Sequence, residues 1–106
     1  MIHELKRYEA TPGNAQALRE RFANVTMPIF RRLGINVLHC WQADDERQSF
    51  YYLVSFPDEA ARQAAWQAFG SDAEWKAAKA ASETAGPLLA TQTTTLLHPC
   101  SFSPAA

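Results

Sequence analysis

The sequence is poor in the residues that mark specialised sites and processing signals. It has only 4 glycines, all isolated, so it contains no glycine-rich phosphate loop. Its 2 cysteines, Cys40 and Cys100, are too few for the disulfide framework of a small secreted domain, which favours reduced thiols in the cytoplasm. No window approaches the ~18 apolar residues of a membrane span, and the first residues lack the apolar core of a signal peptide. These features predict a cytoplasmic protein with no membrane partner.

The chain also lacks an excess of charge of either sign. Its 10 basic and 11 acidic residues leave a net charge of −1, so no extended basic surface is available for nucleic acid. Hydrophobic residues make up 47% and charged residues 20%, which is ordinary for a folded globular protein. A chain of 106 residues is sufficient for one hydrophobic core. We therefore expect a single domain and no nucleic-acid partner.

Hydrophobic patterning predicts the order strand, helix, strand, strand, helical stretch, strand. The expected strands are residues 2–9, 35–41, 50–56 and 89–98, and the polar segment 43–48 makes a hairpin. This order is the βαββαβ arrangement of the ferredoxin-like fold, an α+β architecture with a four-stranded antiparallel sheet and both helical segments on one face. We assign residues 1–99 to this domain and residues 100–106 to a short C-terminal tail.

The first expected helix has the clearest periodicity. Its apolar residues recur at spacings of three and four: Ala15, Leu18, Phe22, Val25 and Ile29. Pro28 falls inside this stripe and has no N–H to donate, so we expect the helix to kink or restart there. Thr11 is expected to cap its start, and Gly34 is expected to end it. In the second helical stretch, Asp58 and Asp72 are each expected to begin a helix.

The predicted sheet has one face that no helix of the chain covers. That face would carry a large share of the aromatic and β-branched side chains of the strands. Apolar surface of this extent seldom stays exposed to water on a monomer. We therefore expect a two-fold homodimer in which two sheets stack face to face.

Several short groups of residues spread along the chain carry a family resemblance. They are Glu4-Leu5, Tyr8, Pro12-Gly13, Pro28, Gly34, Trp41, Arg62, Trp66 and Asp72-Ala73-Glu74-Trp75. On these residues the chain resembles the NIPSNAP family over nearly its whole length. The resemblance implies the dimeric α+β barrel group, in which two ferredoxin-like sheets stack into a barrel, and it implies no defined reaction. Where the family often has arginine in the first strand, this chain has Lys6, which cannot bind a carboxylate with the bidentate geometry of a guanidinium.

Polar side chains of the first strand are the main candidates for a site. Glu4, Lys6 and Tyr8 alternate onto one side of this strand. If that side faces the helices, the carboxylate and the ammonium become an acid/base pair inside a cavity. The alternative is a structural ion pair with a tyrosine at the edge of the core. Trp41, Tyr52, Trp66 and Trp75 would line a pocket for a flat ligand, or would simply be core residues.

Other site chemistries have little support in the sequence. The only imidazoles are His3, His39 and His98, and no third ligand at metal-binding spacing accompanies them. Haem-handling members of the barrel group use a helix or loop histidine as the iron ligand, and none of these three histidines lies in an expected helix. No serine has the surroundings of a nucleophile, and Gly-x-Ser-x-Gly is absent. We therefore expect no metal and no cofactor, and no residue pattern identifies catalytic residues.

These observations lead to one functional expectation and two alternatives. We expect a homodimeric NIPSNAP protein, without established catalysis, whose cavity between sheet and helices holds a small, mostly apolar molecule. The residues assigned to ligand binding are Glu4, Tyr8, His39, Trp41 and Trp66. One alternative is a cofactor-independent monooxygenase or isomerase of the barrel group, with Tyr8, His39 and Trp66 acting on the substrate. The other is an interaction module whose core leaves no cavity.

Overall fold

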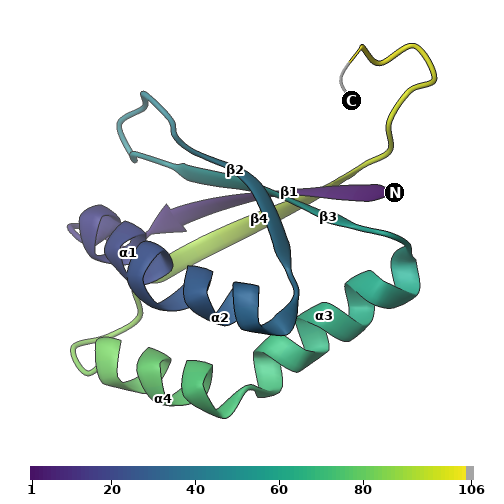
Figure 1. The fold of residues 1–106 in the computed structure, drawn as a ribbon. Helices are drawn as coiled ribbons and strands as arrows, with labels where there is room; N and C mark the ends of the chain where they lie inside the picture. The colour runs from purple at the N-terminus through teal and green to yellow at the C-terminus, as the bar shows by residue number, and fades with distance from the viewer. Residues whose placement is uncertain (105–106) are drawn as a thin grey trace.

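The computed structural model describes residues 1–104 and shows one antiparallel sheet with helices on one of its faces (Figure 1). The strands are β1 (Ile2–Ala10), β2 (Asn36–Gln42), β3 (Phe50–Phe56) and β4 (Leu89–Leu97). The helical elements are α1 (Ala15–Arg21), η1 (Phe22–Thr26), α2 (Met27–Leu33), α3 (Glu59–Ser71) and α4 (Ala73–Ser82). The strand order is β2-β3-β1-β4, and each neighbouring pair is antiparallel. The predicted ferredoxin-like α+β fold is confirmed.

Strand β1 lies in the interior of the sheet. It pairs with β3 on one side and with β4 on the other, so that Leu5 lies opposite Leu53 and His3 lies opposite Leu97. Because a strand alternates its side chains between two faces, the register also fixes which residues share a face. Glu4, pairing with buried Val54, faces the helices.

The helical segment between β1 and β2 is interrupted near Pro28. α1 runs into the π-helical turn η1, in which the N–H of Met27 donates to the carbonyl oxygen of Phe22, and Pro28 is the second residue of α2. A proline ring clashes with the carbonyl four residues earlier in an α-helix, and a wider turn directly before it relieves this clash. The predicted interruption is confirmed, in the form of a π turn.

This π turn changes which side chains reach the core. Phe22, Thr26 and Phe30 recur every four residues and all three are buried, whereas the predicted stripe residue Val25 is only half-buried. A π turn inserts roughly one extra residue into an α-helix, so it rotates the residues that follow. Of the predicted stripe, Leu18, Phe22 and Ile29 are buried, so the periodicity predicted the helix and most of its buried face. It did not predict that Thr26 and Phe30 are buried as well.

Most helix ends follow the predicted capping chemistry. The side chain of Asp58 accepts a hydrogen bond from the Ala61 N–H, and that of Asp72 accepts one from the Trp75 N–H. Gly34 ends α2 with a φ of 76°, a left-handed conformation that favours glycine. The prediction for Thr11 is wrong: residue 14 precedes α1, and the Thr11 hydroxyl donates to the Pro87 carbonyl at 2.8 Å, tying this turn to the segment before β4.

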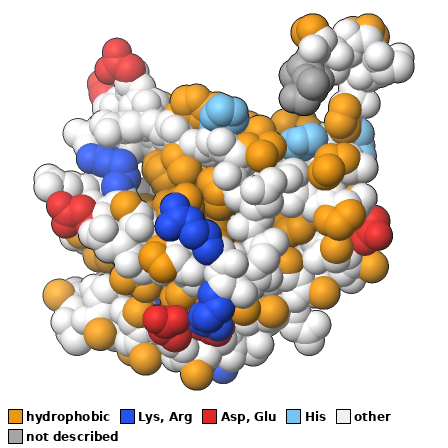
Figure 2. Space-filling view, in the orientation of Figure 1, with side chains coloured by type: hydrophobic (Ala, Val, Ile, Leu, Met, Phe, Trp, Pro, Cys, Tyr) orange, Lys and Arg blue, Asp and Glu red, His pale blue; other side chains and the backbone are white. Residues whose placement is uncertain are grey.

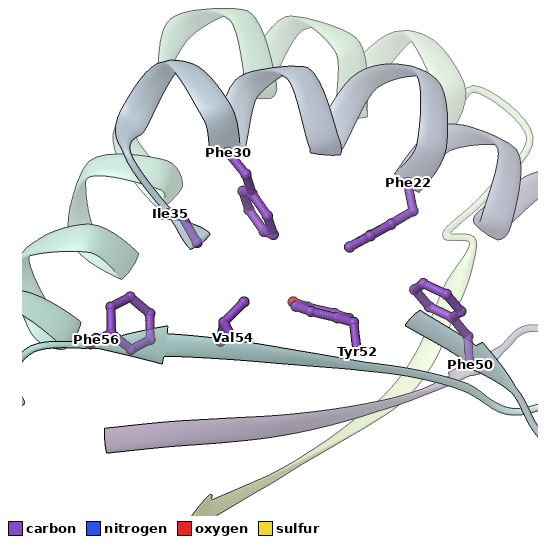
Figure 3. Close-up of a cluster of buried hydrophobic side chains, with 7 residues drawn as sticks. All are labelled: Phe22, Phe30, Ile35, Phe50, Tyr52, Val54 and Phe56. Atoms are coloured by element: carbon purple, nitrogen blue, oxygen red, sulfur yellow. The ribbon is translucent and has the colours of Figure 1, made fainter. Parts of the chain in front are cut away.

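The core lies between the sheet and the helical layer (Figure 3). Phe50, Tyr52, Val54 and Phe56 alternate along β3 and are buried, while Phe22 and Phe30 project toward them from η1 and α2. The ring centroids of Phe22 and Tyr52 are 4.6 Å apart, which is contact distance for aromatic side chains. The core thus covers the helix-facing side of β3, and space remains beside β1 and β4.

After β4 the chain leaves the sheet. Residues 98–104 extend away from the domain and contain one turn, in which the Ser103 N–H donates to the Cys100 carbonyl oxygen (Figure 1). The expected tail begins here, although its final residues, 105–106, lie outside the described residues.

Candidate functional site

A cavity of about 310 Å³ lies between the sheet and the helices, beside the aromatic core. Its aromatic walls are formed by Tyr8, Phe22, Trp66, Phe69 and Trp75. Its polar lining comes from Lys6, Arg21, Thr26, Lys79 and Gln92. Ligand sites in proteins typically combine a largely apolar lining with a few convergent polar groups, at volumes from a few hundred Å³ upward. This cavity therefore has the composition of a binding site for a small molecule.

Glu4 lies fully buried behind the lining residues Lys6 and Trp66 and holds β1 to α3. Its Oε1 accepts hydrogen bonds from the Trp66 Nε1–H at 2.9 Å and from the Arg62 Nη1–H at 3.0 Å. Its Oε2 lies 2.8 Å from the Lys6 ammonium; this contact lacks the angle of a good hydrogen bond but is a close ion pair between two poorly exposed groups. Both oxygens are thus engaged by the protein, which favours a structural role for the carboxylate.

The electrostatics around Glu4 keep it ionised. Burial by itself raises the pKa of this carboxyl, but the close contact with charged Lys6 and the hydrogen bonds from Trp66 and Arg62 outweigh burial and leave the pKa below its ordinary value. Arg62 also binds Glu59 through Nε and Nη2, at 2.8 and 2.7 Å. A carboxylate held in this way is a poor general base at neutral pH, because a proton is costly to add to it.

The Tyr8 hydroxyl reaches the cavity from β1, two residues beyond Lys6 on the same face. It shares a hydrogen bond of 2.7 Å with the hydroxyl of Tyr52, which is itself 0% exposed. Burial raises the pKa of Tyr8, and burial raises that of Tyr52 well above its ordinary value, so both hydroxyls are protonated at neutral pH. Tyr8 is therefore available as a neutral hydrogen-bonding group and not as a phenolate.

A second charged cluster closes the cavity from the helical side. The Arg21 Nη1 donates to Glu83 Oε2 at 2.7 Å and to Ser82 Oγ at 3.1 Å, and Lys79 lies 3.3 Å from Glu83 Oε1. The hydrogen bond from Arg21 lowers the pKa of Glu83, which is thus a carboxylate at neutral pH. The guanidinium also packs over the Trp75 ring, with 5.1 Å between its carbon and the ring centroid.

The structure brings three of the five predicted ligand-binding residues together and separates the other two. Tyr8 and Trp66 line the cavity, and Glu4 binds Trp66 directly behind them. His39 and Trp41 lie opposite Leu53 and Tyr51, on the sheet face away from the helices, because the alternate residues of β3 face the core. Their rings stack on each other at 5.4 Å between centroids, and neither lines the cavity.

The uncovered sheet face is a mixture of apolar and polar side chains. It presents Leu5, Trp41, Tyr51, Leu53 and Leu97 together with His3, Arg7, His39, Thr91, Thr93 and Thr95. In the space-filling view, histidine side chains lie among hydrophobic ones on the upper side of the molecule, where the sheet is (Figure 2). Trp41 is 46% exposed and Leu97 42% exposed, which is high for large apolar side chains.

Sequence reasoning missed the basic groups of the cavity on the helical side. Arg21 falls between the stripe residues Leu18 and Phe22, and a charged residue within an apolar stripe is a signal that this position faces something polar. Lys79 and Gln92 carry no such signal, because their surroundings in the sequence are those of an ordinary solvent-facing position. Their convergence on Tyr8 depends on the packing of α4 and β4 around β1.

Other kinds of site are not found in the part of the chain that the structure describes. Within residues 1–104 no three histidine, cysteine, aspartate or glutamate side chains gather in a way that suits a metal ion. The described helices include none with the length and apolar character to cross a membrane. Cys40 and Cys100 are both exposed and unpaired with each other.

Comparisons with known proteins agree on the family and the fold. The chain is similar in structure to an uncharacterised NIPSNAP domain protein from Burkholderia xenovorans, with a TM-score of 0.83 and 22% identity over 99% of this chain and 100% of that one. A NIPSNAP family protein from Agrobacterium tumefaciens gives a TM-score of 0.83 at 17% identity, over 99% of this chain and 98% of that one. No curated protein sequence matches the chain.

A more distant similarity extends to proteins described as enzymes. A putative antibiotic biosynthesis monooxygenase from Nitrosomonas europaea has a TM-score of 0.64 at 11% identity, over 93% of this chain and 98% of that one. At this identity the similarity establishes a shared fold alone. The sequence profile described as NIPSNAP matches residues 3–104, nearly the whole chain. The protein belongs to the NIPSNAP family.

Proposed function

We propose that this NIPSNAP protein binds a small, mostly apolar molecule in the cavity beside Tyr8 and Trp66, and that it does so as a homodimer. The observation that carries the proposal is the cavity of about 310 Å³, which the aromatic core does not fill. Its lining combines aromatic side chains with a few polar groups, the usual composition of a small-molecule site of a few hundred Å³. A core that served packing alone would leave no such space.

The homodimer rests on the uncovered sheet face. Leu5 and Leu53 are adjacent at its centre, and Trp41 and Leu97 lie on the flanking strands with much of their surface exposed. Stacking this face on the same face of a second copy would bury these side chains and satisfy two-fold symmetry. A cytoplasmic location fits two exposed, unpaired thiols, Cys40 and Cys100, since reducing compartments preserve such groups.

Binding is tested by a thermal-shift screen against a metabolite library at fixed protein concentration. A ligand present at ~100 times its Kd stabilises the native state by about 2.7 kcal/mol. For a domain of this size that corresponds to a rise in Tm of roughly 10 °C. Gln92→Trp should abolish the shift because residue 92 lines the cavity, while Gln67→Trp on the exposed side of α3 should preserve it.

The alternative of a cofactor-independent monooxygenase or isomerase has one supporting observation. The cavity holds Tyr8 and Lys6 in an aromatic setting, and a protein of similar fold is described as an antibiotic biosynthesis monooxygenase. Any ligand from the screen can be incubated with the protein in air while oxygen uptake and ligand mass are recorded. Oxygen consumption or isomerisation that Gln92→Trp abolishes would favour the enzyme, and an unchanged ligand favours binding alone.

A further inference from the structure

The hydrogen atoms of the two tyrosine hydroxyls can be assigned from burial. The Tyr52 side chain is 0% exposed, and the one acceptor found for its O–H among residues 1–104 is the hydroxyl oxygen of Tyr8, at 2.7 Å. A buried O–H without an acceptor is costly, so Tyr52 donates and Tyr8 accepts. The hydroxyl hydrogen of Tyr8 then takes no part in this hydrogen bond. Since the Tyr8 hydroxyl has no other hydrogen-bond partner in this part of the chain and Tyr8 lines the cavity, its O–H is free to donate into that space.

Two cationic groups beside this hydroxyl have donors to spare. The Lys6 ammonium uses one N–H for Thr94 Oγ1 at 2.9 Å and lies 2.8 Å from Glu4, which leaves a third. Within residues 1–104, Arg21 makes side-chain hydrogen bonds through Nη1 alone, so Nε and Nη2 have no protein acceptor. Arg21 and Tyr8 line the same cavity, and the charge of Arg21 opposes the effect of burial on the pKa of Tyr8.

The charges around the cavity favour an anion. Arg21 and Lys79 share one carboxylate, that of Glu83, so this cluster keeps a positive charge. Lys6 and Arg62 are balanced by Glu4 and Glu59. No acidic side chain is among the described residues that line the cavity, whereas three basic ones are. Donors and positive charge therefore converge on a space with aromatic walls.

The aromatic walls do not offset this preference by attracting a cation. A positively charged ligand would be expected to pack on the face of a tryptophan ring. The Lys6 ammonium already lies 4.8 Å from the ring centroid of Trp66, and the Arg21 guanidinium carbon lies 5.1 Å from that of Trp75. Each tryptophan ring thus already has a protein cation packed over it.

We propose that the ligand of the cavity is a carboxylate on a flat apolar body, whose carboxylate accepts the free O–H of Tyr8 and faces Lys6 and Arg21. The proposal rests on the proposed function, since it names the chemical class of the molecule that the same cavity binds. The apolar body lies against Phe22, Phe69 and Trp75. Lys6 would then have two roles, as the ion-pair partner of Glu4 and as a positive charge that faces the ligand.

The test compares 2-naphthoate with 2-naphthamide, which have the same ring system and differ in charge. Isothermal titration calorimetry with the unmutated protein measures both affinities at neutral pH. We expect the carboxylate to bind at least ~10-fold more tightly, as for a hydrogen bond to a charged group. Equal or tighter binding of the amide would overturn the carboxylate proposal while leaving ligand binding in place. Failure of both probes to bind would overturn both proposals.

Two tyrosine variants form a matched pair for the second step. Tyr8→Phe and Tyr52→Phe remove the same hydrogen bond between hydroxyls, and thermal unfolding of each reports the loss of stability. The loss should be larger for Tyr8→Phe, because the buried Tyr52 O–H then has no acceptor. Tyr8→Phe also removes the donor to the ligand, so it should weaken 2-naphthoate by about 10-fold and 2-naphthamide much less. Tyr52→Phe keeps that donor and should change the affinity for 2-naphthoate by less than ~3-fold. Equal losses of affinity in the two variants would show that Tyr8 does not bind the carboxylate. The comparison of the two probes remains decisive if either variant does not fold.

Discussion

Replacing Glu4 with glutamine tests the central contact between sheet and helices. The buried carboxylate accepts from Trp66 and Arg62 and pairs with Lys6. Glutamine is nearly the same size and keeps one oxygen acceptor, but its amide N–H₂ then faces the Lys6 ammonium, a donor against a donor. The substitution therefore removes a charge without creating a cavity.

The expected loss follows from what the partners can do afterwards. Removing one partner of a buried ion pair costs about 3–5 kcal/mol, because the other charge is left uncompensated. Arg62 retains two hydrogen bonds to Glu59, and Lys6 retains Thr94. We therefore expect the lower end, about 3 kcal/mol, which lowers the Tm of a domain of this size by roughly 12 °C.

The control uses the other carboxylate on the same arginine. Glu59→Gln removes an ion pair to Arg62, but its side chain is 46% exposed, so solvent compensates for most of the loss. Thermal unfolding of the two variants at pH 7 and equal protein concentration gives the comparison. If Glu4→Gln lowers the Tm no more than Glu59→Gln does, the carboxylate is not the anchor that its contacts indicate.

Three further predictions follow from the fold. The pKa of Glu59 is lowered to about 2, mainly by its hydrogen bond from Arg62, so below its ordinary pKa the unfolded chain binds a proton that the folded chain does not. The free energy of unfolding, measured with urea, should therefore be constant above about pH 5 and should fall as the pH drops toward 2. Leu53→Lys on the uncovered sheet face should convert a sedimenting dimer to a monomer, while Gln67→Lys on α3 should not; a monomeric parent protein would refute the dimer. Gly34→Ala should lower the free energy of unfolding by about 1 kcal/mol, because φ at this position is 76°, where an alanine side chain is strained. Gly70→Ala lies inside α3 and should leave the free energy of unfolding unchanged or raise it by up to ~1 kcal/mol. Changes of the opposite sign would contradict these arguments from backbone conformation.

The sequence predicted the sheet well because its signals are local. The run 50–56 alternates between core and surface and is flanked by polar or proline residues, and β3 spans the same residues. The π turn could not be predicted, since residues at spacings of three and four fit an unbroken helix equally well. Pro28 indicated that the helix is interrupted but did not indicate how the turn before it accommodates the ring.

From the sequence, only the part of the site that lies on β1 could be predicted. Glu4 and Tyr8 share a face by alternation alone, and burial of Glu4 against Trp66 confirms that this face meets the helices. His39 and Trp41 also share a face, but alternation does not say which one. That choice depends on pairing with β3 and on the bulge between Val37 and His39, which are contacts between distant parts of the chain.

The place of β1 in the sheet has a consequence for how the protein is made. This strand is synthesised before the other strands, yet one of its edges stays unpaired until residues 89–97 of β4 have been translated. At a synthesis rate of roughly 5–20 residues per second, that edge is open for several seconds on each nascent chain. An open interior strand is a template for pairing with a neighbouring chain on the same messenger RNA. Charged residues Arg7 and Glu9 along β1 reduce this hazard, so their replacement by apolar residues should lower the yield of folded protein more than it lowers the stability of what does fold.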